Sequence, residues 1–248
     1  MITNIHQAVD AAQEATRKFD SLTWWRGHSA ILDWKLVPSV YRRQDGNHYR
    51  YESNIVARFA ARAPSRYAGL PELGRWDQWL VLMQHYGLPT RLLDWTESVL
   101  IAVYFAVRDH PDKDGRLWAV SPHKLNQHQI GISANVTPGN PKVKPLFLPP
   151  FNQNAQQQEK IVAFLPTEVD TRMILQQSGF TVHGTPQSLD GLECQDDILI
   201  KWDIPASAKS TLVAELSRLG VHESTLFPDL EHLAKEIAGL NFRFPDPG

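Results

Sequence analysis

The sequence predicts an α+β fold. Two observations lead to this prediction: helical periodicity dominates the first half of the chain, and short strand-like segments dominate the second half. Segregation of this kind favours α+β over a repeated β-α-β winding. The 248 residues suit one large domain, and no internal repeat or clean linker divides them, so we expect a single domain over residues 1–248.

The composition narrows the class of protein. A formal net charge of -2 argues against a general polyanion-binding surface but leaves room for a local basic cleft. The one cysteine, Cys194, excludes an intramolecular disulfide framework and a cysteine-rich zinc site, and it favours the cytoplasm. Residues 1–20 have the period of an amphipathic helix and the chain has no apolar run of 18 residues, so neither a signal peptide nor a membrane span is expected.

Four elements are predicted before residue 70. They are an N-terminal helix over 5–19 capped by Thr3 or Asn4, a strand over 22–28 that ends at Arg26-Gly27, a loop or short turn over 36–43, and a helix over 52–60 closed by Pro64. Glycine after a strand lets the backbone turn sharply or approach a ligand closely. Arg26-Gly27 is therefore a candidate for a functional position.

The polar residues between two central helices form a second candidate. A helix over 76–86 and an almost wholly apolar helix over 99–107 flank about a dozen residues that include His, Arg, Asp and Thr. Buried polar groups must pair with one another or face a ligand, because an unpaired one costs ~1–3 kcal/mol. Two interpretations stay open: a structural Arg91–Asp94 network with Thr96 as the N-cap of the second helix, or a ligand-binding site.

The second half of the chain contains most of the predicted strands. They cover 115–120, 160–164, 172–175, 180–183 and 198–204, and a turn over Gln176-Gln177-Ser178-Gly179 precedes the fourth. The segment over 126–158 is rich in Asn, Gln, Pro and Gly, and its length predicts an irregular functional loop or mobile flap. Two C-terminal helices, over 205–219 and 227–237, complete the chain within residues 205–240.

Common catalytic motifs are missing from the sequence. It has no Gly-rich phosphate loop, no Gly-x-Gly-x-x-Gly, no Gly-x-Ser-x-Gly and no His-Glu-x-x-His, and its ten histidines do not cluster at ligand spacing, so no metal is expected. Two polar clusters remain, over 24–28 and 85–96.

Together these clusters resemble the FRG domain family. The resemblance rests on the aromatic-Arg-Gly at Trp25, the Leu-x-Pro-Ser segment over 36–42, and the run Gln-His-x-Gly-x-Pro-Thr-Arg-Leu-Leu-Asp-Trp-Thr over 84–96. A Gln-Gln-x-Gly-Phe-Thr turn at 176 and a Leu-Phe-Pro-Asp-Leu segment at 226 fit the same pattern, so the resemblance spans roughly residues 23–237. Trp25 stands where the family usually has Phe or Tyr, which keeps an aromatic ring. The family carries no assigned activity.

The same residues are similar, more weakly, to toxin-type mono-ADP-ribosyltransferases. These enzymes open their NAD site with a strand ending in aromatic-Arg-Gly, then add a hydroxyl-bearing strand that leads into an apolar helix ending in Phe-Ala. Residues 25–27, 92–96 and 102–106 match those elements. The resemblance implies a mixed, twisted sheet, and NAD as substrate. A guanidinium suits phosphate or ribose oxygens, and aromatic rings suit the nicotinamide.

The resemblance also implies roles for particular residues. The catalytic candidates are Arg26, Asp94, Gln176 and Gln177, and the NAD-binding candidates are Trp25, Gly27, His28, His85, Thr90, Arg91, Trp95 and Thr96. The family places a glutamate on a later strand, but the matching segment here, 172–177, has no carboxylate. Asp94, Glu97 and Glu159 are the candidates to supply the missing charge.

Three hypotheses of function follow. The first is an NAD-dependent transferase that modifies a nucleic acid (RNA favoured) or a protein, acting as a toxin in phage defence or in a toxin–antitoxin pair, with a neutralising antitoxin or chaperone as partner. The second is a non-catalytic module that binds a nucleotide or a partner. The third is a metal-independent nuclease that uses Arg26, His85 and Asp94. Structural roles stay open for the same residues: Arg26 as a brace for Asp94, His85 as a core histidine, and the two glutamines as turn residues.

Overall fold

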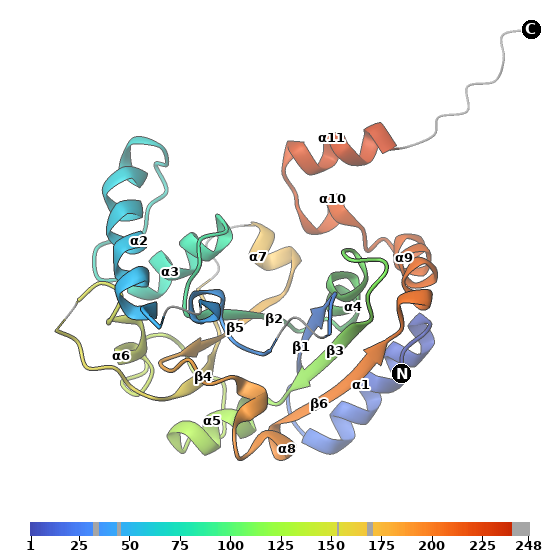
Figure 1. Cartoon of the computed structure of the whole chain (residues 1–248), viewed down its shortest axis with the longest axis horizontal. Coiled ribbons are helices and arrows are strands. Elements are labelled where there is room, and N and C mark those ends of the chain that lie inside the picture. The colour runs from blue at the N-terminus through green and yellow to red at the C-terminus, as the bar shows by residue number, and fades with distance from the viewer. Residues whose placement is uncertain (32–34, 44–45, 153, 168–170, 240–248) are drawn as a thin grey trace, which may run out of the picture.

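A six-stranded antiparallel sheet forms the centre of the computed structural model, which describes residues 1–31, 35–43, 46–152, 154–167 and 171–239 (Figure 1). The strands are β1 (Trp24–His28), β2 (Leu92–Thr96), β3 (Gly115–Val120), β4 (Ile161–Phe164), β5 (Ser178–His183) and β6 (Leu199–Ile204), in the spatial order β4-β5-β2-β1-β3-β6. The α+β class is confirmed. The expected mixture of parallel and antiparallel strands is wrong for these strands, because every pairing between them is antiparallel.

Helices lie around this sheet. They are α1 (Ile5–Phe19), α2 (His48–Arg62), α3 (Trp76–His85), α4 (Val99–Val107), α5 (Pro122–Ile130), α6 (Lys144–Phe147), α7 (Thr171–Leu175), α8 (Gln195–Ile198), α9 (Lys209–Arg218), α10 (Glu223–Leu226) and α11 (Leu230–Gly239). Short 3-10 turns cover Ser39–Arg42, Ala63–Ser65, Leu189–Gly191 and Ala206–Ala208. None of the helices within the described ranges is both long and apolar enough to cross a membrane.

The caps of two helices follow ordinary capping chemistry. The Asn4 side chain accepts a hydrogen bond from the Gln7 backbone N–H, which makes Asn4 the cap of α1 as expected. Ser98 caps α4 by accepting from the Ile101 backbone N–H. The prediction of Thr96 as that cap was wrong, because the extended strand β2 continues through Thr96.

Two further predictions fail locally. The strand expected over 172–175 is the short helix α7, and it leaves Ile174 and Leu175 exposed. The segment over 126–158 is not irregular throughout, since its first residues complete α5 and its middle contains α6. Residues 153 and 240 lie outside the described part of the chain, as do 241–248.

The hydrophobic core divides the sheet into two halves. The β2 half contains β4, β5 and β2, and the β1 half contains β1, β3 and β6. On one face a single cluster spans both halves and includes Trp24, Trp95, Trp118 and Ala163. On the opposite face there are two clusters, one between the β1 half and helices α1, α4 and α9, the other between the β2 half and helices α2, α3 and α6.

Candidate functional site

The seam between the two halves is the centre of the candidate site. Strand β1 pairs with β3 at five registered positions but with β2 at one, Trp25 with Thr96. Beyond that pair no further β1–β2 residues are in register, and the Arg26 guanidinium bridges the two strands instead. Its Nη1 donates to the backbone carbonyl of Asp94 at 2.7 Å. The same nitrogen lies 3.8 Å from the Asp94 carboxylate. A side chain thus replaces a strand–strand hydrogen bond at this point.

The Arg26 side chain spans the seam. Residues of a strand alternate between the two faces, so Arg26 starts on the face of Trp24 while Asp94 projects from the opposite face. Reaching both the carbonyl and the carboxylate of Asp94 places the guanidinium in the gap itself. Burial lowers the pKa of Arg26 to about 10, a shift that Asp94 opposes and Arg42 increases, so Arg26 keeps its charge at neutral pH.

A cavity of about 290 Å³ opens at this gap on the face that carries α4. Its walls combine aromatic rings, two arginines, two aspartates and neutral hydrogen-bonding groups. The lining residues are Trp25, Arg26, Gly27, Ser29, Gln84, Asp94, Trp95, Thr96, Ala102, Phe105, Arg108, Asp109, Gln176 and Ser178. We call this cavity the seam pocket.

Gly27 allows α4 to form one wall of the pocket. A Cβ atom at this position would lie 2.0 Å from the carbonyl oxygen of Ala102 and 2.5 Å from the backbone nitrogen of Ala106. No larger residue fits there without moving the helix. The glycine after Arg26 is therefore needed for close packing of α4 against β1, rather than only for approach to a ligand.

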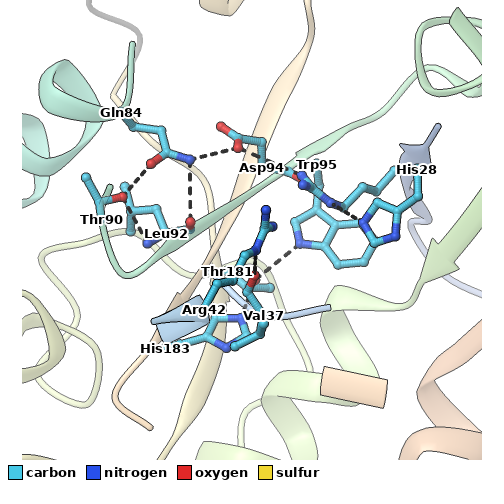
Figure 2. A network of polar contacts seen from close by, with 11 residues as sticks. His28, Val37, Arg42, Gln84, Thr90, Leu92, Asp94, Trp95, Thr181 and His183 are labelled. Carbon is cyan, nitrogen blue, oxygen red and sulfur yellow. Dashed lines mark hydrogen bonds and ion pairs between the residues drawn. The ribbon is translucent and has the colours of Figure 1, made fainter. Parts of the chain in front are cut away.

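A polar network holds Asp94 in place (Figure 2). The side-chain Nε2 of Gln84 donates to the Asp94 carboxylate at 2.8 Å, and the side-chain Oε1 of Gln84 accepts from the Thr90 hydroxyl at 2.5 Å. Thr90 is fully buried, so Gln84 is fixed at one end while its other end reaches the pocket. Asp94 keeps 51% of its side chain exposed, which leaves carboxylate oxygen surface available to a ligand.

His28 supports Arg26 from behind. The Arg26 Nε donates to the His28 Nε2 at 3.1 Å, so this ring nitrogen acts as an acceptor and the imidazole is neutral. Burial, assisted by the charges of the nearby Arg26, Arg42 and Arg116, lowers the pKa of His28 to about 2. His28 is 1% exposed, so it orients the guanidinium without facing the pocket.

A second guanidinium, that of Arg42, lies close enough to Asp94 and Arg26 to interact with their charges. The Arg42 Nε donates to the Val37 carbonyl, which anchors the side chain near Asp94, Thr181 and His183 (Figure 2). Burial lowers the pKa of Arg42 and the Asp94 carboxylate opposes that shift. In the same region the Trp95 indole donates to the Thr181 hydroxyl, which in turn contacts His183.

The structure brings together only part of the set predicted from the sequence. Seven candidates line the seam pocket: Trp25, Arg26, Gly27, Asp94, Trp95, Thr96 and Gln176. His28 and Thr90 lie behind it as supports, and Gln177 is exposed outside it. His85 lines a different groove beside Tyr86.

Arg91 has a partner that the sequence did not suggest. The proposed Arg91–Asp94 network was wrong: Arg91 is fully buried and pairs with Glu52 of α2 at 2.6 Å. In an extended strand, residues three apart point to opposite faces, which separates Arg91 from Asp94. The alternative expectation that Arg26 contacts Asp94 is confirmed.

Several pocket residues escaped the sequence reasoning. Gln84, Phe105, Arg108, Asp109 and Ser178 line the pocket but were not among the candidates. Gln84, Phe105 and Ser178 stand inside the matched motifs, so motif membership was an available signal for them. No local pattern marks Arg108 and Asp109. Within the described ranges no three His, Cys, Asp or Glu side chains converge to form a metal-binding group.

Comparison with known families supports the resemblance for the first part of the chain. The family model described as FRG domain matches residues 21–115, which confirms the similarity to that family over this segment. The segment carries Arg26, Gln84, Asp94 and Thr96, and it therefore supplies both strands of the seam and helix α4. No significant match was found among curated proteins or among solved structures.

Proposed function

We propose that the protein binds NAD in the seam pocket and transfers its ADP-ribosyl group to an acceptor. The observation that carries this proposal is the Arg26 guanidinium, held in a gap between two strands by His28 and Asp94, at a pocket lined by aromatic rings. Strand β2 bears Thr96 and leads into the apolar helix α4, beside the strand that bears Arg26. The resemblance to toxin-type transferases implies that order of elements.

The donor set of the pocket suits one end of a dinucleotide. A volume of about 290 Å³ lies at the small end of ligand pockets, so it accommodates the nicotinamide–ribose part and leaves the adenylate outside. Trp25 and Phe105 offer apolar ring surface, Gln176 and Thr96 offer hydrogen bonds to hydroxyls, and the arginines suit phosphate oxygens.

The chemistry assigns a role to Asp94. Transfer breaks the bond between the ribose C1′ and the nicotinamide nitrogen, and its electron pair leaves with the neutral nicotinamide. A nucleophilic atom of the acceptor forms the new bond to C1′ and releases its proton to solvent. Positive charge develops on the ribose, and a fixed carboxylate stabilises it. Asp94 belongs to β2, one of the two strands of the seam, and Gln84 and Arg26 position its carboxylate beside the pocket.

A non-catalytic nucleotide-binding module is the second candidate. It is favoured by one observation: the residues that line the seam pocket, all within the described ranges, include no glutamate. The nuclease hypothesis loses support, because one of its three residues, His85, lines another groove and not this pocket.

Incubation with labelled NAD tests the proposal. Purified wild-type protein is mixed with NAD labelled in the adenylate, together with RNA, DNA or cell lysate in separate reactions, and nicotinamide release is followed in parallel. Arg26→Lys keeps the charge but loses the planar fork, so we expect a loss of about 100-fold in both signals. Arg17→Lys, exposed on α1, is the matched control and should match wild type.

The outcomes separate the candidates. Label in one acceptor pool that is lost with Arg26→Lys supports the transferase. NAD binding without nicotinamide release or transfer supports the module, and strand cleavage with NAD left intact supports the nuclease. Expression in cells extends the test: a toxin should arrest growth as wild type and not as Arg26→Lys.

A further inference from the structure

A second groove lies between α2 and the turn that follows α3. It encloses about 550 Å³, and its floor is apolar. The lining residues are Ile55, Arg58, Phe59, Arg62, Ala63, Arg66, Tyr67, Tyr86 and Leu88. We call it the α2 groove. The groove is lined by three arginines and three aromatic rings and by no carboxylate. These groups define the chemistry of its occupant.

The arginines form a row along one side of the groove. Arg58 and Arg62 are four residues apart on α2, so they lie about 6 Å apart along the helix axis on nearly the same side. Arg66 follows the 3-10 turn after α2, and its guanidinium donates to the Arg62 carbonyl at 2.8 Å, which keeps it beside Arg62. All three are exposed, and among the described residues none of them forms a salt bridge. The only carboxylate of α2, Glu52, is buried against Arg91 and does not neutralise the row.

The local charge contrasts with that of the whole chain. The formal net charge is -2, yet the residues of α2 and of the 3-10 turn after it include no exposed carboxylate. Concentrated positive charge on an otherwise acidic protein attracts an anionic ligand to one place.

The aromatic rings narrow the class of anion. Tyr67 and Tyr86 are 39% and 56% exposed, and their rings meet edge to face at 6.2 Å, which leaves ring faces open to solvent. Phe59 lies half-buried in the floor. A cationic row beside open ring faces is the combination that binds single-stranded nucleic acid, because phosphates pair with the arginines while bases stack on the rings.

The end of α3 lies between the α2 groove and the seam pocket. Gln84 bonds Asp94 in the seam pocket, and Tyr86, two residues further on, lines the α2 groove. The buried Arg91–Glu52 pair fixes α2 to the chain just before β2. A strand bound in the groove that continues past the end of α3 would reach the pocket where C1′ is exposed to attack.

We propose that the α2 groove binds single-stranded nucleic acid and presents it as the acceptor. The role as acceptor rests on the proposed transferase function, whereas binding itself does not. An acidic protein segment is the competing occupant, and the experiment separates the two.

Binding is measured by fluorescence anisotropy without NAD, using labelled RNA and DNA strands of about 12 nucleotides at several salt concentrations. Each Arg→Gln change at Arg58, Arg62 or Arg66 should reduce the slope of log affinity against log salt by about 0.7. Tyr86→Ala should weaken binding about tenfold through lost stacking. Arg17→Gln and Arg218→Gln, exposed on α1 and α9, are matched controls and should change neither quantity.

Two results would overturn the groove: unchanged binding by the triple variant R58Q/R62Q/R66Q, or displacement of the strand by polyglutamate at equal charge concentration. The proposed function fails separately. If strands bind through the groove but NAD is never cleaved, the proposal of nucleic-acid binding is supported and the proposed transferase function is refuted. If both hold, the triple variant should lose label transfer to the strand and keep nicotinamide release to water.

Discussion

The Arg91 guanidinium and the Glu52 carboxylate lie 2.6 Å apart and are almost completely inaccessible to solvent. Arg91 Nε contacts both carboxylate oxygens, its backbone N–H donates to the same carboxylate, and its Nη1 donates to the Leu146 carbonyl. Burial is the largest influence on the pKa of Arg91 and would lower it, but the charge and hydrogen bond of Glu52, together with Tyr41 and Tyr49, outweigh burial and raise the pKa. This ion pair thereby joins helix α2, which carries Glu52, to the residue just before strand β2.

Removal of one partner of this pair should destabilise the fold strongly. Arg91→Met leaves Glu52 buried without a counter-charge, so we expect the free energy of unfolding to fall by about 3–5 kcal/mol in urea titrations. The double variant Arg91→Met/Glu52→Leu removes both charges and should recover much of that loss. Equal losses in the single and double variants would contradict a buried, mutually dependent pair.

Gly27→Ala should damage the protein although it adds one methyl group. The new Cβ would lie 2.0 Å from the Ala102 carbonyl, so α4 must shift and the seam pocket must change shape. We expect a loss of about 1–3 kcal/mol in thermal or urea unfolding, with loss of NAD binding. Gly139→Ala is the matched control, because its added Cβ would meet no atom within 4 Å. Similar stability for both variants would refute the close packing.

The two adjacent glutamines should behave differently. Gln176 lines the seam pocket and donates to the Leu226 carbonyl, so Gln176→Ala should reduce kcat/KM for NAD about tenfold. Gln177 is exposed and has a φ of 48°, a left-handed conformation that glycine adopts more easily. Gln177→Gly should keep full activity and leave the unfolding free energy within about 1 kcal/mol of wild type. Loss of activity in Gln177→Gly would place its side chain in the site after all.

Two buried histidines predict a fall in stability at mildly acidic pH. Burial lowers the pKa of His28 to about 2 and of His183 to about 3, whereas both titrate near pH 6.5 in the unfolded chain. Between those values the unfolded state binds more protons, so the unfolding free energy falls as the pH is lowered, by about 1.4 kcal/mol per pH unit for each histidine.

Urea midpoints at pH 7 and pH 5 measure this dependence. His28→Gln keeps an acceptor for Arg26 but does not titrate, so it should flatten the loss between the two pH values. His6→Gln, on the exposed side of α1, should follow wild type. A His28→Gln variant that loses stability as steeply as wild type would exclude His28 as the source.

Elements with a strong local signal were predictable from the sequence. Helix α4 is apolar on nearly every side and β3 is bounded by turn residues, and the structure has both where they were expected. The run Met173-Ile174-Leu175 has no such signal, since three apolar residues suit a helix or a strand equally. The structure resolves that ambiguity in favour of a helix.

The site was predictable where its residues lie within short sequence motifs. Arg26, Asp94 and Thr96 were identified from two short stretches, and the sheet places those stretches side by side. The Arg91–Glu52 pair joins residues 39 positions apart, and a local pattern holds no information on such a contact. Gln84 begins the motif over 84–96, so motif membership was a signal for it, but the last turn of a helix does not reveal which neighbour its side chain will face.

Strands β1 and β2 share a single registered pair, so only this pair joins the backbones of the two sheet halves beside the mouth of the seam pocket. The shared cluster that contains Trp24 and Trp95 packs across both halves of the sheet on the opposite face. Each half is held together by its own ladder of hydrogen bonds. We expect a small change in the angle between the two halves to alter the width of the mouth without breaking either ladder. We therefore expect the width of the mouth and the resistance to unfolding to depend on different contacts, so that each can change while the other is preserved.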